Sequence, residues 1–319
     1  MRRPLKFFFY FLLLCLGILL TLGVVIQFSD LPSYEPEKVQ LKIQSNPEMI
    51  AEGARLSSML CNNCHSGPDN ILSGRLLSEA PPEFGTIYSA NITADKEHGI
   101  GAWTDAEIAC FLRTGVKRDG SFVPFYMPRF LHLSDRDLHS IIAYLRSGRS
   151  ELKAVSRSQP PSRPSFLVKF LCRVAWKPFP YPAQPIESPD SANQVAFGKY
   201  LVTGRYDCYP CHSEDFTKVD FSVPENTAGF MAGGIKLSDL SGKTIRSSNL
   251  TPDDETGIGT WDFSRFRDAL VYGKLTDGGV IRYPMMPYTA LRESETRAIY
   301  AYLQQIPPIK NKVERGVPE

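Results

Sequence analysis

Two short motifs of identical pattern carry most of the chemistry that this sequence can do. Each holds two cysteines, separated by two residues, and a histidine directly after the second: Cys61, Cys64 and His65, and then Cys208, Cys211 and His212. Two thiols at this spacing can each add to one vinyl group of a haem, and the adjacent histidine can then bind the iron. The sequence therefore predicts two covalently attached haem c groups, each with a histidine as one axial ligand.

Zinc sites and redox-active dithiols also use paired cysteines. A structural zinc site takes four ligands, and a thioredoxin-like dithiol needs a β-α-β setting. The other histidines, His98, His132 and His139, all lie in the first half, so the second motif has no histidine beyond His212 to complete a comparable zinc site. We expect surface or capping roles for these three, and haem at both motifs.

Methionine is the expected second axial ligand, because a thioether raises the potential and closes the iron to other molecules. Two loops offer one. Met127 precedes Pro128 in the first half, and Met285 and Met286 precede Pro287 in the second. Alignment from the last helix favours Met285, whereas the Met-Pro dipeptide favours Met286. The sequence interpretation takes Met127 and Met286 as ligands, with Met285 as core packing.

An internal repeat surrounds these residues and predicts the elements that position them. Residues 91–103 match residues 249–261 at eight of thirteen positions. Within the repeat, Trp103 and Trp261 could donate to a haem propionate or pack in a core, and Asn91 and Asn249 could hold a loop near the haem or cap a turn.

Each half is expected to form three helices joined by loops rich in glycine and proline, with strands hard to find. A capping box at Thr104 to Glu107 and a similar start at Ser134 mark two helix beginnings. The fold class is all-α, and the expected helices cover residues 47–60, 106–113 and 138–146, then 195–203, 263–272 and 293–305.

The N-terminus predicts a membrane anchor. Residues 7–26 are uncharged and mostly apolar, and Arg2, Arg3 and Lys6 precede them. This length suits a bilayer, and the basic end belongs in the cytoplasm. A cleaved signal peptide is the alternative, but its apolar core is shorter. We therefore expect everything after Phe28 on the outer side.

The predicted organisation follows from these elements and from a crowd of prolines in the middle of the chain. Within that region, residues 166–176 have apolar positions at helical spacing, which predicts a short amphipathic helix; packing on a domain face is favoured over a second membrane contact. The expected parts are an anchor (1–28), a tether that lifts the first domain off the membrane (29–46), a first domain (47–150), a linker (151–190), a second domain (191–308) and a tail (309–319).

The composition of the chain limits the number of domains and the kinds of partner. The chain has 319 residues, 43% hydrophobic and 22% charged, which is ordinary for about two globular domains. A formal net charge of +2 leaves no strongly basic face for nucleic acid. The remaining cysteines, Cys15, Cys110 and Cys172, lie in apolar surroundings and are expected to be small buried hydrophobes.

The stretch around residues 88–104, the Met-Pro loop and the closing Ala-Tyr-Leu helix resemble the cytochrome c subunits of bacterial membrane-bound alcohol, aldehyde and gluconate dehydrogenases. Those subunits typically carry three haem domains, whereas this chain has two motifs and an N-terminal anchor. The resemblance implies two tandem class I-like cytochrome c domains on the periplasmic side of the inner membrane. It also implies electron transfer between a donor, such as a dehydrogenase, and a respiratory acceptor.

Other haem proteins remain as alternatives. A haem enzyme, such as a di-haem peroxidase or a thiosulfate dehydrogenase, would need one iron with an open or displaceable ligand. A haem c subunit of a terminal oxidase would share every feature above and differ in its partner.

Overall fold

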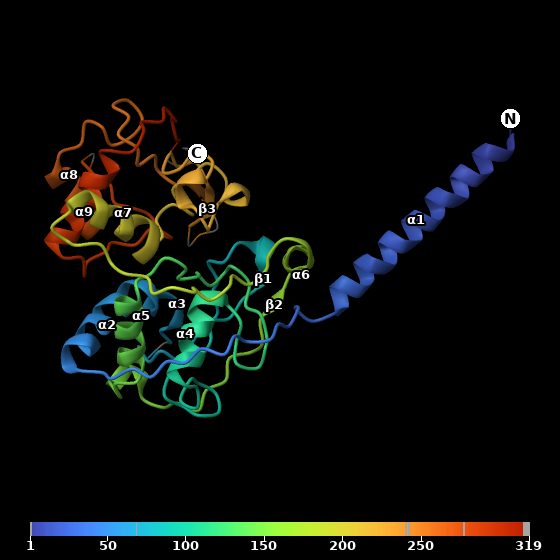
Figure 1. The fold of residues 1–319 in the computed structure, drawn as a ribbon. Coiled ribbons are helices and arrows are strands. Elements are labelled where there is room, and N and C mark those ends of the chain that lie inside the picture. Colours follow the sequence, from blue (N-terminus) through green and yellow to red (C-terminus); the bar gives the residue numbers. More distant parts are fainter. Residues whose placement is uncertain (1, 68, 240, 242, 277, 315–319) are drawn as a thin grey trace.

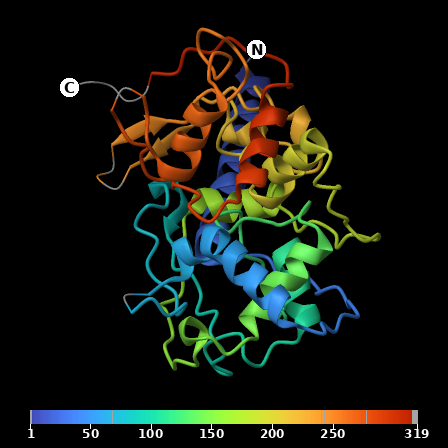
Figure 2. The same cartoon turned by 90° about the vertical axis from the view of Figure 1, so that its left-hand side faces the viewer.

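The computed structural model describes residues 2–67, 69–239, 241, 243–276 and 278–314. Met1 and the last five residues of the expected tail lie outside the described residues. The described chain is mostly helical, as predicted. A long N-terminal helix stands away from two lobes that rest on each other, and both views show the lobes in direct contact (Figures 1 and 2).

Helix α1 covers Arg2–Phe28, and its part from Lys6 to Phe28 is long and apolar enough to cross a membrane. Its large side chains face outward; Phe7 is 74% exposed and Leu19 66% exposed. An apolar helix with no protein packed along most of its length fits the expected anchor.

The first lobe contains helices α2 (Pro47–Leu60), α3 (Asn62–His65), α4 (Asp105–Thr114) and α5 (Asp135–Leu145). The predicted capping box opens α4, and the Ser134 side chain caps α5. Helices α2 and α5 cross at Gly53, where a Cβ atom would lie 1.8 Å from the Ser140 carbonyl oxygen. Only glycine permits this close approach of two backbones.

The second lobe repeats the arrangement with α7 (Gln194–Tyr200), α8 (Phe263–Tyr272) and α9 (Glu293–Leu303). Gly198 takes the place of Gly53, since a Cβ there would lie 1.9 Å from the Ala298 carbonyl oxygen. Cys208 follows Gly198 by ten positions, whereas Cys61 follows Gly53 by eight. A π-helical segment, η3 (Leu201–Arg205), accommodates the longer connection.

The structure adds short elements that the sequence pattern does not reveal. Two small antiparallel sheets pair β1 (Gly85–Thr86) with β2 (Arg163–Pro164), and β3 (Lys236–Ser238) with β4 (Thr244–Arg246). Short 3-10 helices are η1 (Pro82–Phe84), η2 (Ser150–Leu152), η4 (Phe216–Lys218) and η5 (Pro224–Asn226).

The segments expected to be tether and linker both lie on the first lobe. In the tether, Tyr34 N donates to the Gly120 carbonyl at 2.9 Å, and Ile43 N donates to Asp105 Oδ2 at 3.1 Å. The start of the linker is held by β1–β2 pairing and by Gln159 Nε2, which donates to the Gly74 carbonyl at 2.9 Å. The tether therefore follows the surface of the first lobe. Helix α6 (Phe166–Val174) forms where the amphipathic pattern predicts it.

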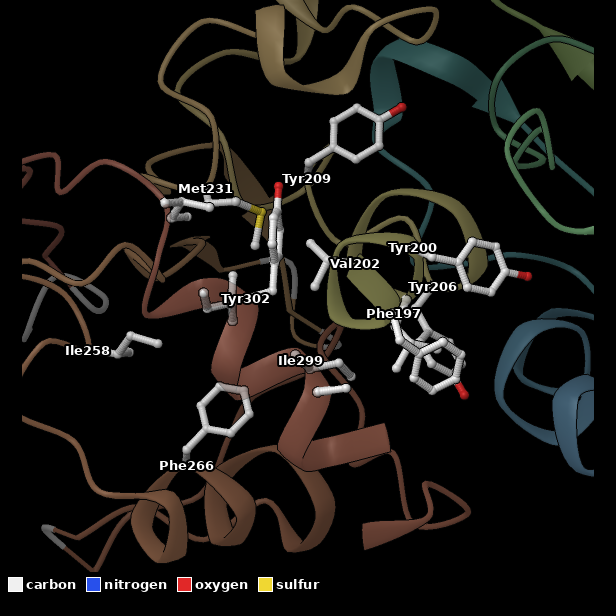
Figure 3. Packing of buried hydrophobic residues seen from close by; sticks show 14 residues of the cluster. Phe197, Tyr200, Val202, Tyr206, Tyr209, Met231, Ile258, Phe266, Ile299 and Tyr302 are labelled. Atoms are coloured by element: carbon white, nitrogen blue, oxygen red, sulfur yellow. The ribbon is translucent and has the colours of Figure 1, made fainter. Parts of the chain in front are cut away.

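Each lobe has its own core. Figure 3 shows the core of the second lobe, where Phe266, Ile299 and Met231 pack together with the tyrosines of the η3 region. The Tyr200 side chain points out of this core toward the first lobe. Two separate cores place one Cys-x-x-Cys-His motif in each lobe.

Candidate haem sites

The first Cys-x-x-Cys-His motif directly follows α2, and the second follows α7 and the π-helical segment η3. In the first, Cys61 N donates to the Ser57 carbonyl, which continues α2 into the motif, and His65 N donates to the Cys61 carbonyl at 3.0 Å. In the second, His212 N donates to the Cys208 carbonyl, also at 3.0 Å. One helical turn therefore sets the cysteines and the imidazole at the same relative positions in both lobes.

The two imidazoles are buried and oriented in the same way. His65 is 8% exposed, and its Nδ1 lies 2.8 Å from the Ala90 carbonyl oxygen; His212 is 9% exposed, and its Nδ1 lies 2.9 Å from the Ser248 carbonyl oxygen. Burial lowers the pKa of both histidines. A neutral imidazole that donates from Nδ1 to a carbonyl keeps Nε2 for a metal, which is the usual arrangement of a metal-binding histidine.

The carbonyls that orient the imidazoles are fixed by Asn91 and Asn249, one residue further along the chain. Asn91 Nδ2 donates to the carbonyls of Val155 and Arg157 at 2.9 and 3.0 Å. Asn249 Nδ2 donates to the Ile309 carbonyl at 2.8 Å. Each asparagine also accepts two hydrogen bonds from the threonine two positions later. Both are 4% exposed.

From the sequence, these asparagines could either hold a loop near the haem or cap a turn. The structure shows that they do both, and that the loop which they hold carries the carbonyl bound to the histidine. The repeated Asn-x-Thr pattern marks both asparagines in the sequence. It does not reveal that Asn91 supports the loop bound to His65, because the two residues are 26 positions apart.

All seven cysteines are free in the part of the chain that the structure describes. Burial raises the pKa of the Cys61 thiol to about 11 and that of Cys208 to about 12. Cys110 and Cys172 are 3% and 0% exposed, which confirms that they are small buried hydrophobes.

The two methionine loops can be aligned through their backbone hydrogen bonds. Val123 N donates to the Gly115 carbonyl, and Ile281 N donates to the Gly273 carbonyl, both at 2.9 to 3.0 Å. After each loop, Phe130 N and Tyr288 N donate to the carbonyls of two leucines in equivalent helices, Leu112 and Leu270.

Between these matched bonds, the counterpart of Met127 is Met285. Met286 is 39% exposed, whereas Met285 is only partly exposed and Met127 packs on the first core. The backbone register therefore favours Met285 over the predicted Met286, which rests on the Met-Pro dipeptide alone.

The residues present fit a haem in each lobe. Each lobe offers a pair of thiols, an oriented imidazole and a methionine loop that follows the middle helix, in the same order and with matching backbone hydrogen bonds. These are the groups that a covalently bound haem requires.

The two tryptophans have packing contacts. Trp103 packs edge-on against Phe111 with ring centroids 5.8 Å apart, and the Arg265 guanidinium lies 4.3 Å from the Trp261 ring centroid. Of the three other histidines, His132 Nε2 lies 2.8 Å from the Phe221 carbonyl oxygen of the second lobe, and the His98 backbone belongs to a turn at Asp95.

A network of six charged side chains joins the lobes close to both motifs. From the second lobe, Arg205 donates to Asp137 of the first lobe at 2.7 Å and to Glu295 at 2.5 Å. From the first lobe, Arg55 donates to both carboxylate oxygens of Glu295 at 2.8 Å. The side chains of Arg205, Asp137 and Glu295 are at most 6% exposed.

The outer part of the network pairs Arg292 with Glu52 at 2.5 Å, and Glu52 also accepts from Arg55. Three arginines thus face three carboxylates, and each lobe supplies both signs. Because a buried charge without its partner is costly, the network holds the lobes in one orientation. No motif marks these residues in the sequence.

A second polar contact brings the methionine loop of one lobe to the cysteine motif of the other. Burial and the neighbouring Glu79 carboxylate, which also pairs with Arg75, raise the pKa of the Tyr283 hydroxyl. Arg75 Nη2 in turn donates to the Asn63 carbonyl, within the first motif, at 2.7 Å. The second methionine loop therefore lies beside Cys64.

Comparison with known proteins finds cytochrome c subunits among the relatives of this chain. No family model matches the chain. It is 28% identical over 272 residues to the cytochrome c subunit of the alcohol dehydrogenase (quinone) of Gluconobacter oxydans, which covers 80% of this chain and 54% of the relative. It is 29% identical to the fructose dehydrogenase cytochrome subunit of Gluconobacter japonicus, over 80% of this chain and 51% of the relative.

A third relative matches nearly end to end. The chain is 27% identical to a diheme cytochrome c-type protein of Cereibacter sphaeroides, over 84% of this chain and 92% of the relative. By contrast, it spans about half the length of the dehydrogenase subunits. These relatives confirm the resemblance to cytochrome c subunits of dehydrogenases and support haem and electron transfer.

Proposed function

We propose that this chain is a membrane-anchored di-haem cytochrome c with two tandem class I-like domains, residues 47–150 and 191–308. It transfers electrons between a donor on the periplasmic side, a dehydrogenase being the donor that the relatives' names support, and an acceptor of the respiratory chain. The observation that carries the proposal is the repeated imidazole geometry, in which His65 and His212 are buried and each is bound through Nδ1 to a carbonyl.

A bound haem c would supply one-electron chemistry at its iron. The protein residues would supply everything else. Cys61 and Cys64, then Cys208 and Cys211, would hold the two groups covalently. His65 and His212 would bind the iron through Nε2, while Asn91 and Asn249 keep the rings from turning. Fixed rings suit electron transfer, because a site that does not rearrange adds little to the barrier.

The opposite axial position would be filled by Met127 in the first domain and by Met286 or Met285 in the second. The sequence favours Met286 and the backbone register supports Met285. Either sulfur would close the iron to other molecules, so that only electrons pass.

The interface between the lobes supports transfer inside the protein. Arg205, Asp137 and Glu295 hold the two domains together, and Tyr283 places the second methionine loop beside the first cysteine motif. Electrons entering at one centre would therefore reach the other through a fixed contact, without movement of the linker.

Helix α1 supports the proposed placement at the inner membrane of a bacterium, with the lobes on the periplasmic side. The basic residues before the span favour a cytoplasmic N-terminus.

The decisive experiment is purification from membranes in mild detergent, with a pyridine haemochrome assay for haem per chain and mass spectrometry of copurifying proteins. We expect two haems per chain and a redox enzyme as companion. A colourless protein from cells with active haem-attachment machinery would refute the proposal. Turnover of peroxide or thiosulfate by the isolated protein would favour a haem enzyme instead.

A further inference from the structure

Helix α6 presents an apolar face that the two lobes leave uncovered. Phe166, Leu167, Phe170 and Val174 are 44%, 46%, 39% and 59% exposed. Their spacing places them on one side of the helix. The rings of Phe166 and Phe170 are stacked, with centroids 6.3 Å apart, which makes the patch continuous.

The opposite side of α6 is fully packed. Val168 and Cys172 are 0% exposed and belong to a small core shared with Val116 and Phe122 of the first lobe. The amphipathic pattern of α6 favours packing on a domain, and one face of the helix does pack there. Because that face is already satisfied, the exposed patch is not needed to hold α6 in place.

The position of α6 identifies what can cover the patch. Lys169 Nζ donates to the Gln27 carbonyl at 2.7 Å, and Arg173 Nη2 donates to Ser29 Oγ at 2.5 Å and to the Asp30 carbonyl at 2.6 Å. These acceptors lie at the end of the apolar span. Figure 1 shows α6 beside the lobe-proximal end of α1. The patch is therefore at the level where the chain leaves the span.

The basic residues in and after α6 also fit a position at the end of the apolar span. Lys169 and Arg173 lie on the helix flank between its buried and exposed faces, and Lys177 follows its C-terminus. Apolar side chains with basic neighbours are the pattern of a helix that lies in a membrane interface, where the cations remain among the headgroups.

We propose that α6 is a second membrane contact, which inserts Phe166, Leu167, Phe170 and Val174 into the boundary between headgroups and acyl chains of the bilayer that α1 spans. This inference rests on the proposed anchor. A single helix would let the lobes rotate above the membrane, whereas two contacts fix one face of the first lobe toward the lipid.

The test places the photoreactive residue p-benzoylphenylalanine at one position at a time in the full chain. The positions are Leu167 in α6, Leu12 in α1, and Tyr272 as control. Tyr272 is 55% exposed and ends α8, the helix that Figure 1 shows far from α1. After illumination of native membranes, mass spectrometry measures phospholipid adducts on each haem-loaded variant.

We expect phospholipid adducts at positions 12 and 167 and none at the control position 272. Adducts at 12, with a yield at 167 no greater than at 272, would overturn the second contact and leave the anchor standing. Adducts at 167 without any at 12 would keep the contact and refute α1 as a span. Absence at both positions would overturn both proposals.

Discussion

Arg205 in the second lobe and Asp137 in the first form an ion pair of 2.7 Å in which neither side chain is more than 6% exposed. The Tyr200 hydroxyl also donates to Asp137 and lies 2.9 Å from Ser134 Oγ. Because the ion pair crosses the interface, it helps to hold the two lobes, and with them the two Cys-x-x-Cys-His motifs, in one relative position.

Replacing Asp137→Asn should destabilise the protein strongly. The change leaves the Arg205 guanidinium short of one buried partner, and breaking such a pair costs about 3 kcal/mol. Thermal unfolding in detergent, followed by haem absorbance, measures the effect. The matched control is Glu293→Ala, whose pair with Arg297 is exposed, and its unfolding midpoint should stay near that of the wild type. Equal midpoints for the two variants would contradict the role of the network.

We expect the contact between the two lobes to weaken in acid, because it depends on the charge of Glu52. Burial by itself would raise its pKa, but hydrogen bonds and charges from Arg55 and Arg292 outweigh burial and lower the pKa to about 2. The pKa in the folded protein lies below the ordinary 4.5, so the stabilisation is complete above about pH 4.5 and is lost as the pH falls toward 2.

The Glu52→Gln variant should be less stable than the wild type at pH 7 and should differ from it less as the pH falls below 4.5. Unfolding midpoints across the acid range provide the measurement. A constant difference between the two proteins at every pH would show that the charge of Glu52 is not responsible.

Asn249→Ala should disturb the second haem site alone. The substitution removes the acceptor of the buried Thr251 N–H and one of the two donors to the Ile309 carbonyl. This costs about 1 to 3 kcal/mol and frees the segment whose Ser248 carbonyl orients His212. We expect a lower unfolding midpoint and a changed redox potential at one of the two haems. Asn226→Ala, at the exposed end of the 3-10 helix η5, is the control and should change neither quantity. A shift in both potentials would argue for general loosening.

The axial methionines can be assigned by substitution with leucine. Methionine-bound ferric haem has a weak far-red absorption band, and Met127→Leu should remove about half of it in a di-haem protein. In the second lobe, the backbone register predicts that Met285→Leu removes the other half and that Met286→Leu does not. The reverse result would establish Met286, as the Met-Pro dipeptide predicts.

Gly198→Ala should disrupt the crossing of α7 and α9. A Cβ atom would lie 1.9 Å from the Ala298 carbonyl oxygen, so the helices must separate. Overpacking of this kind costs about 1 to 3 kcal/mol. Gly17→Ala, in α1, is the control because nothing lies within 4 Å of the added atom. If both variants unfold like the wild type, the close crossing does not contribute to stability.

Much of the protein follows from local pattern. The apolar span, the capping box at Thr104, the Ser134 cap and the amphipathic stretch of α6 all appear where the sequence predicts them. Such features depend on residues within one or two helical turns, and the sequence shows those residues side by side.

The internal repeat added the methionine loops to the prediction of two haem sites. It matched the cysteine motifs and the methionine loops of the two halves, yet it left the ligand between Met285 and Met286. Alignment from the last helix pointed to Met285 and the Met-Pro dipeptide pointed to Met286. The backbone hydrogen bonds at Gly273 and Tyr288 support the register of Met285.

Short-range spacing is enough to predict the two Cys-x-x-Cys-His motifs, the long apolar N-terminal helix and the mostly helical halves from the sequence. Tertiary structure alone decided that Asn91 holds the carbonyl that orients His65, that Arg205 of one lobe pairs with Asp137 of the other, and that α6 lies against the end of α1. These contacts join residues far apart in the chain, and only the packing of complete helices brings them within hydrogen-bond distance.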